Sequence, residues 1–266
     1  MLNPSFAVIF SMLLQSEGSD NIVALKARAQ EGDTRAQVQL GVAYASGRGV
    51  PADDAEAVTW FRKAAEKGDA AGEYSLSEMY MAGRGTVVDP KEGLKWLRRS
   101  AEHGDPRGQF NLAVSYAQGE GVPKDDREAA AWMRKAAEQG LAAGQFGLGA
   151  MYAHGVGVPR NDSEAASWYR RAVDQGDPSA MNNLAFLLAN SSDPKVHDPK
   201  EAIATARRAI QAAPDNPTFL DTLAAAYFEN GDPGKAAETE RAALALKPDN
   251  PSYKKALDKY LNAAMH

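Results

Sequence analysis

The stretch AQVQLGVAYASGRGV, residues 36–50, decides the fold because it recurs along the chain at a constant step of 36 residues. Four residue types return at this step. They are Trp60, Trp96, Trp132 and Trp168; Tyr44, Tyr80, Tyr116 and Tyr152; Leu40, Leu76, Leu112, Leu148 and Leu184; and Gly32, Gly68, Gly104, Gly140 and Gly176. A fixed period of this length indicates a repeat protein whose units stack side by side.

Each unit is predicted to be a hairpin of two helices. Leu76 and Tyr80 are four residues apart and share a helical face, and Leu94, Leu97 and Ala101 form a face on a second helix. Glycines separate the helices, because a helix C-terminus and a tight turn need positive φ. These turns are Gly47–Gly49, Gly83–Gly85, Gly119–Gly121 and Gly155–Gly157.

The helix starts carry a repeated capping signal. Before each second helix an Asp or Asn is followed three residues later by Glu, a spacing that lets the two residues satisfy free backbone N–H groups reciprocally. The pairs are Asp53 with Glu56, Asp89 with Glu92, Asp125 with Glu128, and Asn161 with Glu164. The first helices are predicted to be capped by Asp33, Asp69, Asp105 and Asp177.

Downstream the period changes but the helical pattern continues. The cap returns at residues 198–201 after a longer loop, and a step of 34 residues then separates Asp215-Asn216-Pro217 from Asp249-Asn250-Pro251. The last helix, roughly residues 252–264, carries several charged residues among apolar ones. Such a helix suits the end of a stack, whose outer face contacts water.

Composition is typical of a folded soluble chain: 44% of the 266 residues are hydrophobic and 24% are charged. The formal net charge of -5, with Lys and Arg scattered among acids, predicts no nucleic-acid partner. The chain has no cysteine, which excludes disulfides, thiolate metal sites and cysteine nucleophiles.

The apolar run Phe6–Leu14 has two interpretations, a signal peptide or a hydrophobic capping helix. It has the length of a signal peptide but lacks a preceding basic residue and a following A-x-A site. It is shorter than the ~20 apolar residues that cross a bilayer, so no integral membrane span is expected. The run slightly favours an exported or periplasmic protein, and a cytoplasmic one remains open.

The repeats resemble those of the Sel-one-like repeat family. The resemblance is carried by Ala36–Tyr44, which fits A-x-x-x-L-G-x-x-Y, by the G-x-G-V turn, and by Trp60–Ala65, which fits W-x-x-x-A-A. The 34-residue unit is similar to a tetratricopeptide repeat at Leu223, Ala224, Tyr227, Ala236 and Pro248, with Leu220 in place of the usual tryptophan. The resemblance implies an all-α, right-handed superhelical solenoid of stacked helical hairpins, whose first helices line a concave groove.

These features divide the chain into four parts. Residues 1–20 are the signal peptide or hydrophobic cap, and 21–178 are Sel-one-like repeats. Residues 179–250 are tetratricopeptide-like repeats, and 251–266 form a C-terminal capping helix.

No pattern in the sequence points to catalysis, so we expect no catalytic residues, no metal and no cofactor. The G-x-G tripeptides do not follow strands as nucleotide-binding loops do. The four histidines are scattered without metal-ligand spacing, and the Asp and Glu pairs are explained by capping. The tryptophans are expected to pack within and between repeats, with partners for their N–H groups.

Candidate binding residues lie on the first helices, on a face other than the core face of Leu76 and Tyr80. At 100° per residue Tyr74 and Tyr80 point in different directions. By resemblance to tetratricopeptide packing, the Tyr74 position faces the groove. We call these groove candidates the first-helix strip: Val38, Val42, Tyr74, Glu78, Met81, Arg107, Phe110, Val114, Phe146, Asn182, Phe186 and Phe228. Packing of first helix against first helix explains these residues equally well.

Three functions are compatible with the pattern. The first is a non-catalytic scaffold that binds a peptide or a partner's surface in the groove, and we expect it to be monomeric. The second is an enzyme of the cell-wall or β-lactam hydrolase type, an activity linked to cysteine-rich relatives that this cysteine-free chain does not match. The third is a purely structural element that joins larger assemblies.

Overall fold

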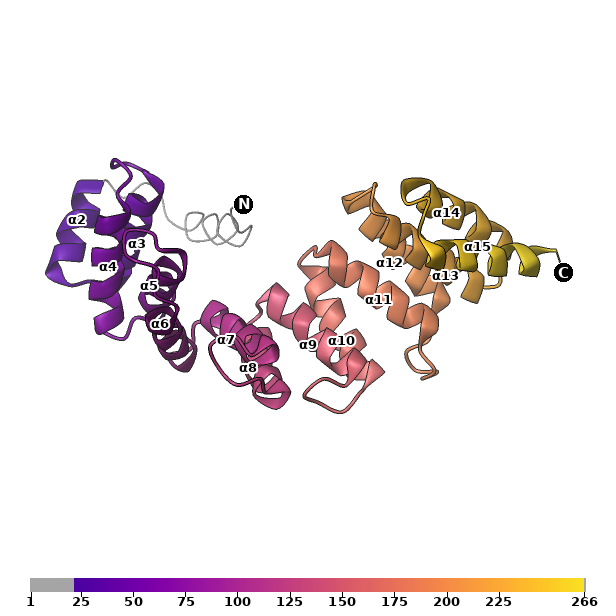
Figure 1. Ribbon diagram of the computed structural model, residues 1–266, viewed down its shortest axis with the longest axis horizontal. Coiled ribbons are helices and arrows are strands. Elements are labelled where there is room, and N and C mark those ends of the chain that lie inside the picture. The colour runs from indigo at the N-terminus through magenta and orange to yellow at the C-terminus, as the bar shows by residue number, and fades with distance from the viewer. Residues whose placement is uncertain (1–21, 266) are drawn as a thin grey trace. The chain divides into compact units, whose positions relative to one another are not determined.

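The computed structural model of the chain describes residues 22–265, and this range is built from helices joined by turns and loops (Figure 1). It contains fourteen helices and no strand. The predicted all-α class is therefore confirmed. No helix in this range has the length and apolar character to cross a membrane. The predictions for residues 1–20 lie outside the described residues.

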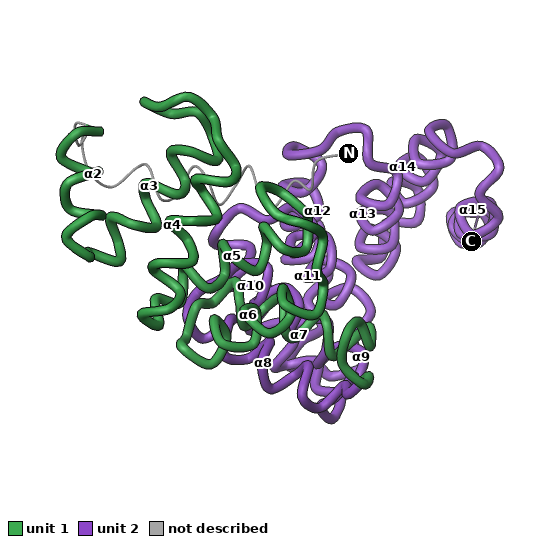
Figure 2. The backbone as a smooth tube through the Cα atoms, turned by 60° about the vertical axis from the view of Figure 1, so that its left-hand side comes forward, with its two compact units in different colours: residues 1–124 green, residues 125–266 purple. Residues whose placement is uncertain are grey.

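The chain divides into two units at Lys124, and each is described by itself (Figure 2). In the first unit the first helices α3 and α5 pack against the second helices α4 and α6, and α5 also packs on α4 and α7 on α6. The helices are α2 (Ile22–Glu31), α3 (Thr34–Ser46), α4 (Asp54–Glu66), α5 (Ala70–Ala82), α6 (Pro90–Glu102) and α7 (Pro106–Gln118).

The second unit continues the same alternation of first and second helices. Helix α9 packs between α8 and α10. From α10 to α15, each helix contacts the one that follows it. The helices are α8 (Asp126–Glu138), α9 (Ala142–His154), α10 (Asp162–Asp174), α11 (Pro178–Asn190), α12 (Pro199–Ala212), α13 (Pro217–Glu229), α14 (Pro233–Leu246) and α15 (Pro251–Ala264).

The predicted N-caps are present, but the predicted second hydrogen bond, between the Glu side chain and the N–H of the cap residue, is not formed at Asp53. Asp53 accepts hydrogen bonds from two backbone N–H groups of α4, at 3.0 Å each, and Asp89 caps α6 in the same way. The expected return bond from Glu56 is wrong, because the Asp53 N–H donates to the carbonyl of Tyr44 at 2.9 Å. The cap therefore ties the second helix to the end of the first.

The periodic tryptophans pack in the interior as predicted. Trp60, Trp96 and Trp168 are buried, and Trp132 is half-buried. The expected partners for the N–H groups are wrong for the three buried rings, since no acceptor among the described residues reaches their Nε1 atoms. A cation instead lies over each ring: Lys63 over Trp60, Arg99 over Trp96, Lys135 over Trp132 and Arg171 over Trp168.

The glycine turns after α5 and α9 run against the start of the preceding second helix. Gly157 has φ +68°, and a Cβ built on it would lie 1.8 Å from the carbonyl oxygen of Asp126. Gly140, at the end of α8, also has positive φ (+87°), but a Cβ there would meet nothing within 4 Å. Of these two glycines, only Gly157 is required by both conformation and space.

We therefore expect Gly157→Ala to destabilise the chain by more than about 2 kcal/mol, because backbone strain and steric overlap add. Gly140→Ala is the matched control and should cost only about 1 kcal/mol, since it adds strain alone. Urea unfolding followed by circular dichroism measures both. Equal losses in the two variants would contradict the close approach at Gly157.

Two neighbouring carboxyl groups, the buried Glu240 and the half-buried Asp221, lie among the last three helices. Glu240 of α14 is 0% exposed, and no hydrogen-bond donor among the described residues reaches either of its oxygens. Burial raises the pKa of Glu240 to about 8, and the charge and hydrogen bond of Asp221 on α13 add to the rise. Burial also raises the pKa of Asp221 and of the Tyr260 hydroxyl on α15. A protonated Glu240 can donate its proton to the Asp221 carboxylate.

This pair predicts a stability that falls with rising pH. The folded pKa of Glu240, about 8, lies above its usual value of 4.5, so the folded state binds the proton more tightly than the unfolded chain. The free energy of unfolding should therefore be highest near pH 5 and fall until about pH 8. Glu240→Gln keeps a donor but cannot titrate, and it should be more stable than the parent at pH 8 by at least about 1.4 kcal/mol.

Glu238→Gln is the control for this experiment, because Glu238 is an exposed carboxylate on the same helix. Urea titrations between pH 5 and 9 should show the parent's pH slope unchanged in Glu238→Gln and reduced in Glu240→Gln. The same slope in all three proteins would show that Glu240 ionises normally.

Candidate peptide-binding surface

The strip begins in the first unit with two side chains that the fold uses for packing. Val38 on α3 is buried in a cluster with Phe61 and Leu76. Tyr74 on α5 is only 4% exposed. At these two positions the structure favours packing between repeats over direct contact with a partner.

Tyr74 is enclosed by residues of the next first helix. The Asn111 amide of α7 donates to the Tyr74 hydroxyl at 3.2 Å, and the Arg107 guanidinium lies 4.5 Å from the ring centroid. Arg107 also forms an ion pair with Asp105 at 2.5 Å. Burial raises the pKa of the nearby Glu78 carboxyl, and the charge of Arg107 opposes the rise. These contacts join α5 to α7.

The remaining strip residues of the first unit are partly accessible. Val42, Phe110 and Val114 are half-buried. Met81 is 37% exposed, and its side chain packs over Gly93 of α6, where a Cβ would lie 2.9 Å from the Met81 Cγ atom. These four side chains form a discontinuous apolar surface.

In the second unit the strip starts at Phe146 on α9. This ring is half-buried, and its centroid lies 5.9 Å from that of Tyr169 on α10. Burial raises the pKa of the Tyr169 hydroxyl, and a hydrogen bond with Asn183 opposes the rise. Phe146 thus supports its own hairpin while keeping part of its surface free.

Helix α11 carries the most accessible aromatic side chain of the strip. Phe186 is 54% exposed, although most of the helix is buried. One turn earlier, Asn182 is 7% exposed, and no donor among the described residues reaches its Oδ1 atom. Its Nδ2 atom makes only a long hydrogen bond, 3.4 Å, to Asn183. Phe186 is therefore an accessible apolar side chain on α11, whereas the Asn182 acceptor one turn earlier is enclosed in the fold.

The strip ends at Phe228 on α13. Its ring lies 4.9 Å from that of Tyr260 on α15, and the Lys259 ammonium is 4.0 Å from the ring centroid. The half-buried Asp221 occupies on α13 the place that Asn182 has on α11, five residues after the N-cap in each helix. Helices α11 and α13 contact each other, so these polar groups lie on neighbouring first helices.

The acidic and histidine side chains of the described residues do not cluster into a metal site. Between residues 22 and 265, no three His, Cys, Asp or Glu side chains gather closely enough to hold a metal ion. His103 instead pairs with the buried Glu73, with 2.7 Å between Nδ1 and Oε2. The hydrogen-bonded acids at the helix starts act as caps.

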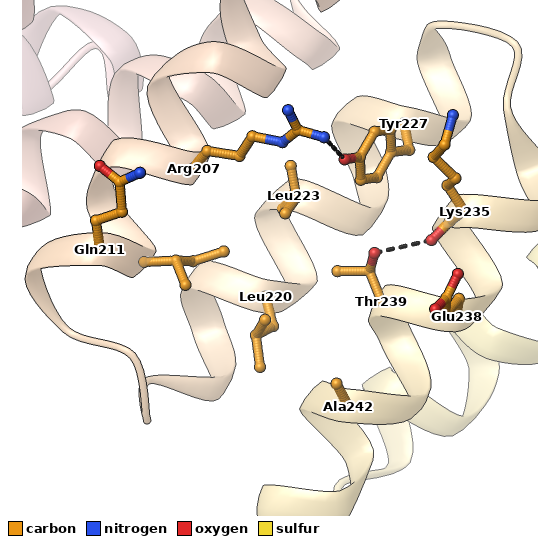
Figure 3. Close-up of a pocket in the computed structure, with 10 residues that line it drawn as sticks. Arg207, Gln211, Leu220, Leu223, Tyr227, Lys235, Glu238, Thr239 and Ala242 are labelled. Atoms are coloured by element: carbon orange, nitrogen blue, oxygen red, sulfur yellow. Dashed lines mark hydrogen bonds between the residues drawn. The ribbon is translucent and has the colours of Figure 1, made fainter.

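A groove that the sequence analysis did not identify lies among α12, α13 and α14 of the second unit (Figure 3). It has a volume of about 620 Å³ and is lined by Arg207, Gln211, Leu220, Leu223, Tyr227, Lys235 and Thr239, among others. The signal that could have revealed it is the end of the tryptophan series, because Thr205 and Thr239 stand where earlier second helices carry tryptophan.

The chain matches two repeat families. The Sel1 repeat matches residues 34–69, 70–105, 106–141 and 142–177, which together make up more than half of the chain. A tetratricopeptide repeat matches residues 195–260. A search of curated proteins gave no significant match.

Two solved structures show the same kind of solenoid. A Sel1 repeat protein from Oxalobacter formigenes is 36% identical, with a TM-score of 0.61 over 65% of this chain and 52% of its own. The protein c5321, a protective antigen of uropathogenic Escherichia coli with the SLR fold, is 27% identical, with a TM-score of 0.58 over 97% of this chain and 64% of its own. The chain therefore spans about half to two thirds of the length of these relatives.

The 36-residue hairpins, their capping aspartates and the matched residues lead to one assignment: the chain belongs to the Sel1 repeat family and carries a tetratricopeptide repeat segment after its Sel1 repeats.

Proposed function

We propose that the chain is a non-catalytic adaptor that binds a peptide segment of a partner protein on the first-helix face of its second unit. The Sel1 and tetratricopeptide fold is typical of protein-interaction scaffolds. The observation that carries the proposal is the 54% exposure of the Phe186 ring on a helix most of whose residues are buried. The packing of α11 leaves this ring uncovered.

A peptide can cover this ring. An apolar side chain of the peptide would cover Phe186 and remove its ring from water, the kind of anchor that contributes most to binding at interfaces.

Selection from a random peptide library tests this proposal, because it needs no identified partner. Peptides selected on the intact chain should bind Phe186→Ala at least about tenfold more weakly, a loss of about 1.4 kcal/mol, because the anchor is removed. Fluorescence polarisation with labelled peptides measures the dissociation constants. Circular dichroism verifies that the variant keeps its helices.

Leu246→Ala is the matched control, because Leu246 is a similarly exposed apolar side chain on the second helix α14. It should leave peptide affinity unchanged. If the selected peptides bind Phe186→Ala as tightly as the parent, or lose affinity only for Leu246→Ala, the binding face is not the one proposed.

A further inference from the structure

The groove of the second unit lies between the second helices α12 and α14, above the first helix α13 (Figure 3). Leu220 and Leu223 form part of its floor, and Tyr227 closes one end. Its rim carries Arg207 and Lys235. Phe186 of α11 does not line this groove, and the groove serves no role in the function proposed above.

The groove occurs where a repeated aromatic side chain is missing. Seven residues after the N-cap, the second helices α4, α6, α8 and α10 carry tryptophan, whereas the same position in α12 and α14 is Thr205 and Thr239. Thr239 lines the groove and hydrogen-bonds its hydroxyl to the backbone of its own helix at 2.8 Å. Its short side chain leaves the space above α13 open.

The first unit shows what fills the equivalent space. There Trp60 of α4 packs on Leu40 and Tyr44 of α3 and against α2, the helix before it. Leu223 and Tyr227 have the same spacing from the N-cap of α13 as Leu40 and Tyr44 have from that of α3. The groove of α13 therefore keeps the leucine and tyrosine that contact an indole and lacks the indole itself.

Cations accompany tryptophan in the earlier repeats, three residues after each ring, and α14 has Ala242 at that position. The groove has two cations from other helix positions, Arg207 and Lys235. Lys63 lies 3.9 Å from the centroid of Trp60, and Arg171 lies 4.3 Å from that of Trp168. At the groove, the Arg207 guanidinium donates to the Tyr227 hydroxyl at 2.6 Å, and Lys235 lies 5.8 Å from the Tyr227 ring. Cations at a rim attract the negative face of an aromatic ring more strongly than they attract an aliphatic side chain.

We propose that this groove is a second binding site, which receives a tryptophan side chain from a segment of a partner protein. The incoming indole would pack on Leu223 and Tyr227 as Trp60 packs on Leu40 and Tyr44. Arg207 and Lys235 would hold its ring face from the rim. The partner thus supplies the side chain that the earlier repeats supply from their own second helices.

N-acetyl-tryptophanamide is a suitable probe, because it carries the indole without the rest of a partner. Methyl-labelled protein titrated with it should show saturable NMR shifts of the Ile210, Leu220 and Leu223 methyl groups. N-acetyl-leucinamide, the aliphatic control, should bind at least about fivefold more weakly because it has no ring face for the cations. Equal binding of the two probes, or no saturable shift, would overturn the proposal.

Thr239→Trp tests the location of the site, because it restores the tryptophan of the earlier repeats. It should reduce probe affinity at least about tenfold while the chain keeps its helices and its melting temperature. Ala242→Glu is a second variant at an exposed lining position, where a longer acidic side chain should also weaken the probe. Undiminished probe binding in both folded variants would place the indole elsewhere and overturn the assignment.

Phe186→Ala separates this site from the first-helix face. It should leave probe binding at the groove unchanged, even where it abolishes binding of the selected peptides. Loss of the methyl shifts in Phe186→Ala would mean that the probe reports on the other face, and it would contradict a separate site.

Discussion

The close approach of each first helix to the second helix before it is the constraint on which the repeat depends. A Cβ built on Gly72 of α5 would lie 2.7 Å from the Cβ of Ala64 on α4, and a Cβ on Gly144 of α9 would lie 2.9 Å from the backbone of Ala137 on α8. Small residues at these contacts let the helix backbones come together, and the larger leucines beside them fill the interior. The leucines at the 36-residue step are almost completely buried.

This packing leaves other surfaces of the hairpins accessible. Since the interior uses the leucine face and the small-residue face of a first helix, the outer face can vary without loss of the hairpin. It holds packing residues at Tyr74, a partly free ring at Phe146 and an exposed ring at Phe186. The second helices vary in a similar way, because the change from tryptophan to Thr239 opens a groove while α14 keeps its contacts with α13.

The sequence predicts the fold well because its signals are local and repeated. Asp53 can be recognised as an N-cap from its neighbours alone, and the tryptophan and leucine series are visible in the spacing itself. The bond from the Asp53 N–H to Tyr44 is harder to predict, since it depends on how the turn brings two helices together. The accessibility of the strip is harder still. Tyr74 is covered by Asn111 and Arg107, which are more than thirty residues away in sequence, and this contact decides its burial.

Photo-crosslinking from the first-helix face tests most directly whether this chain binds partners there. Benzoylphenylalanine placed at position 186 should form an adduct with a library-selected peptide, and the same group at the exposed Val156, in the turn after α9, should form none. Mass spectrometry identifies the crosslinked segments. A strong adduct at 186 alone is the predicted result, whereas equal adducts at both positions, or adducts at 156 only, would contradict recognition by the face of α11.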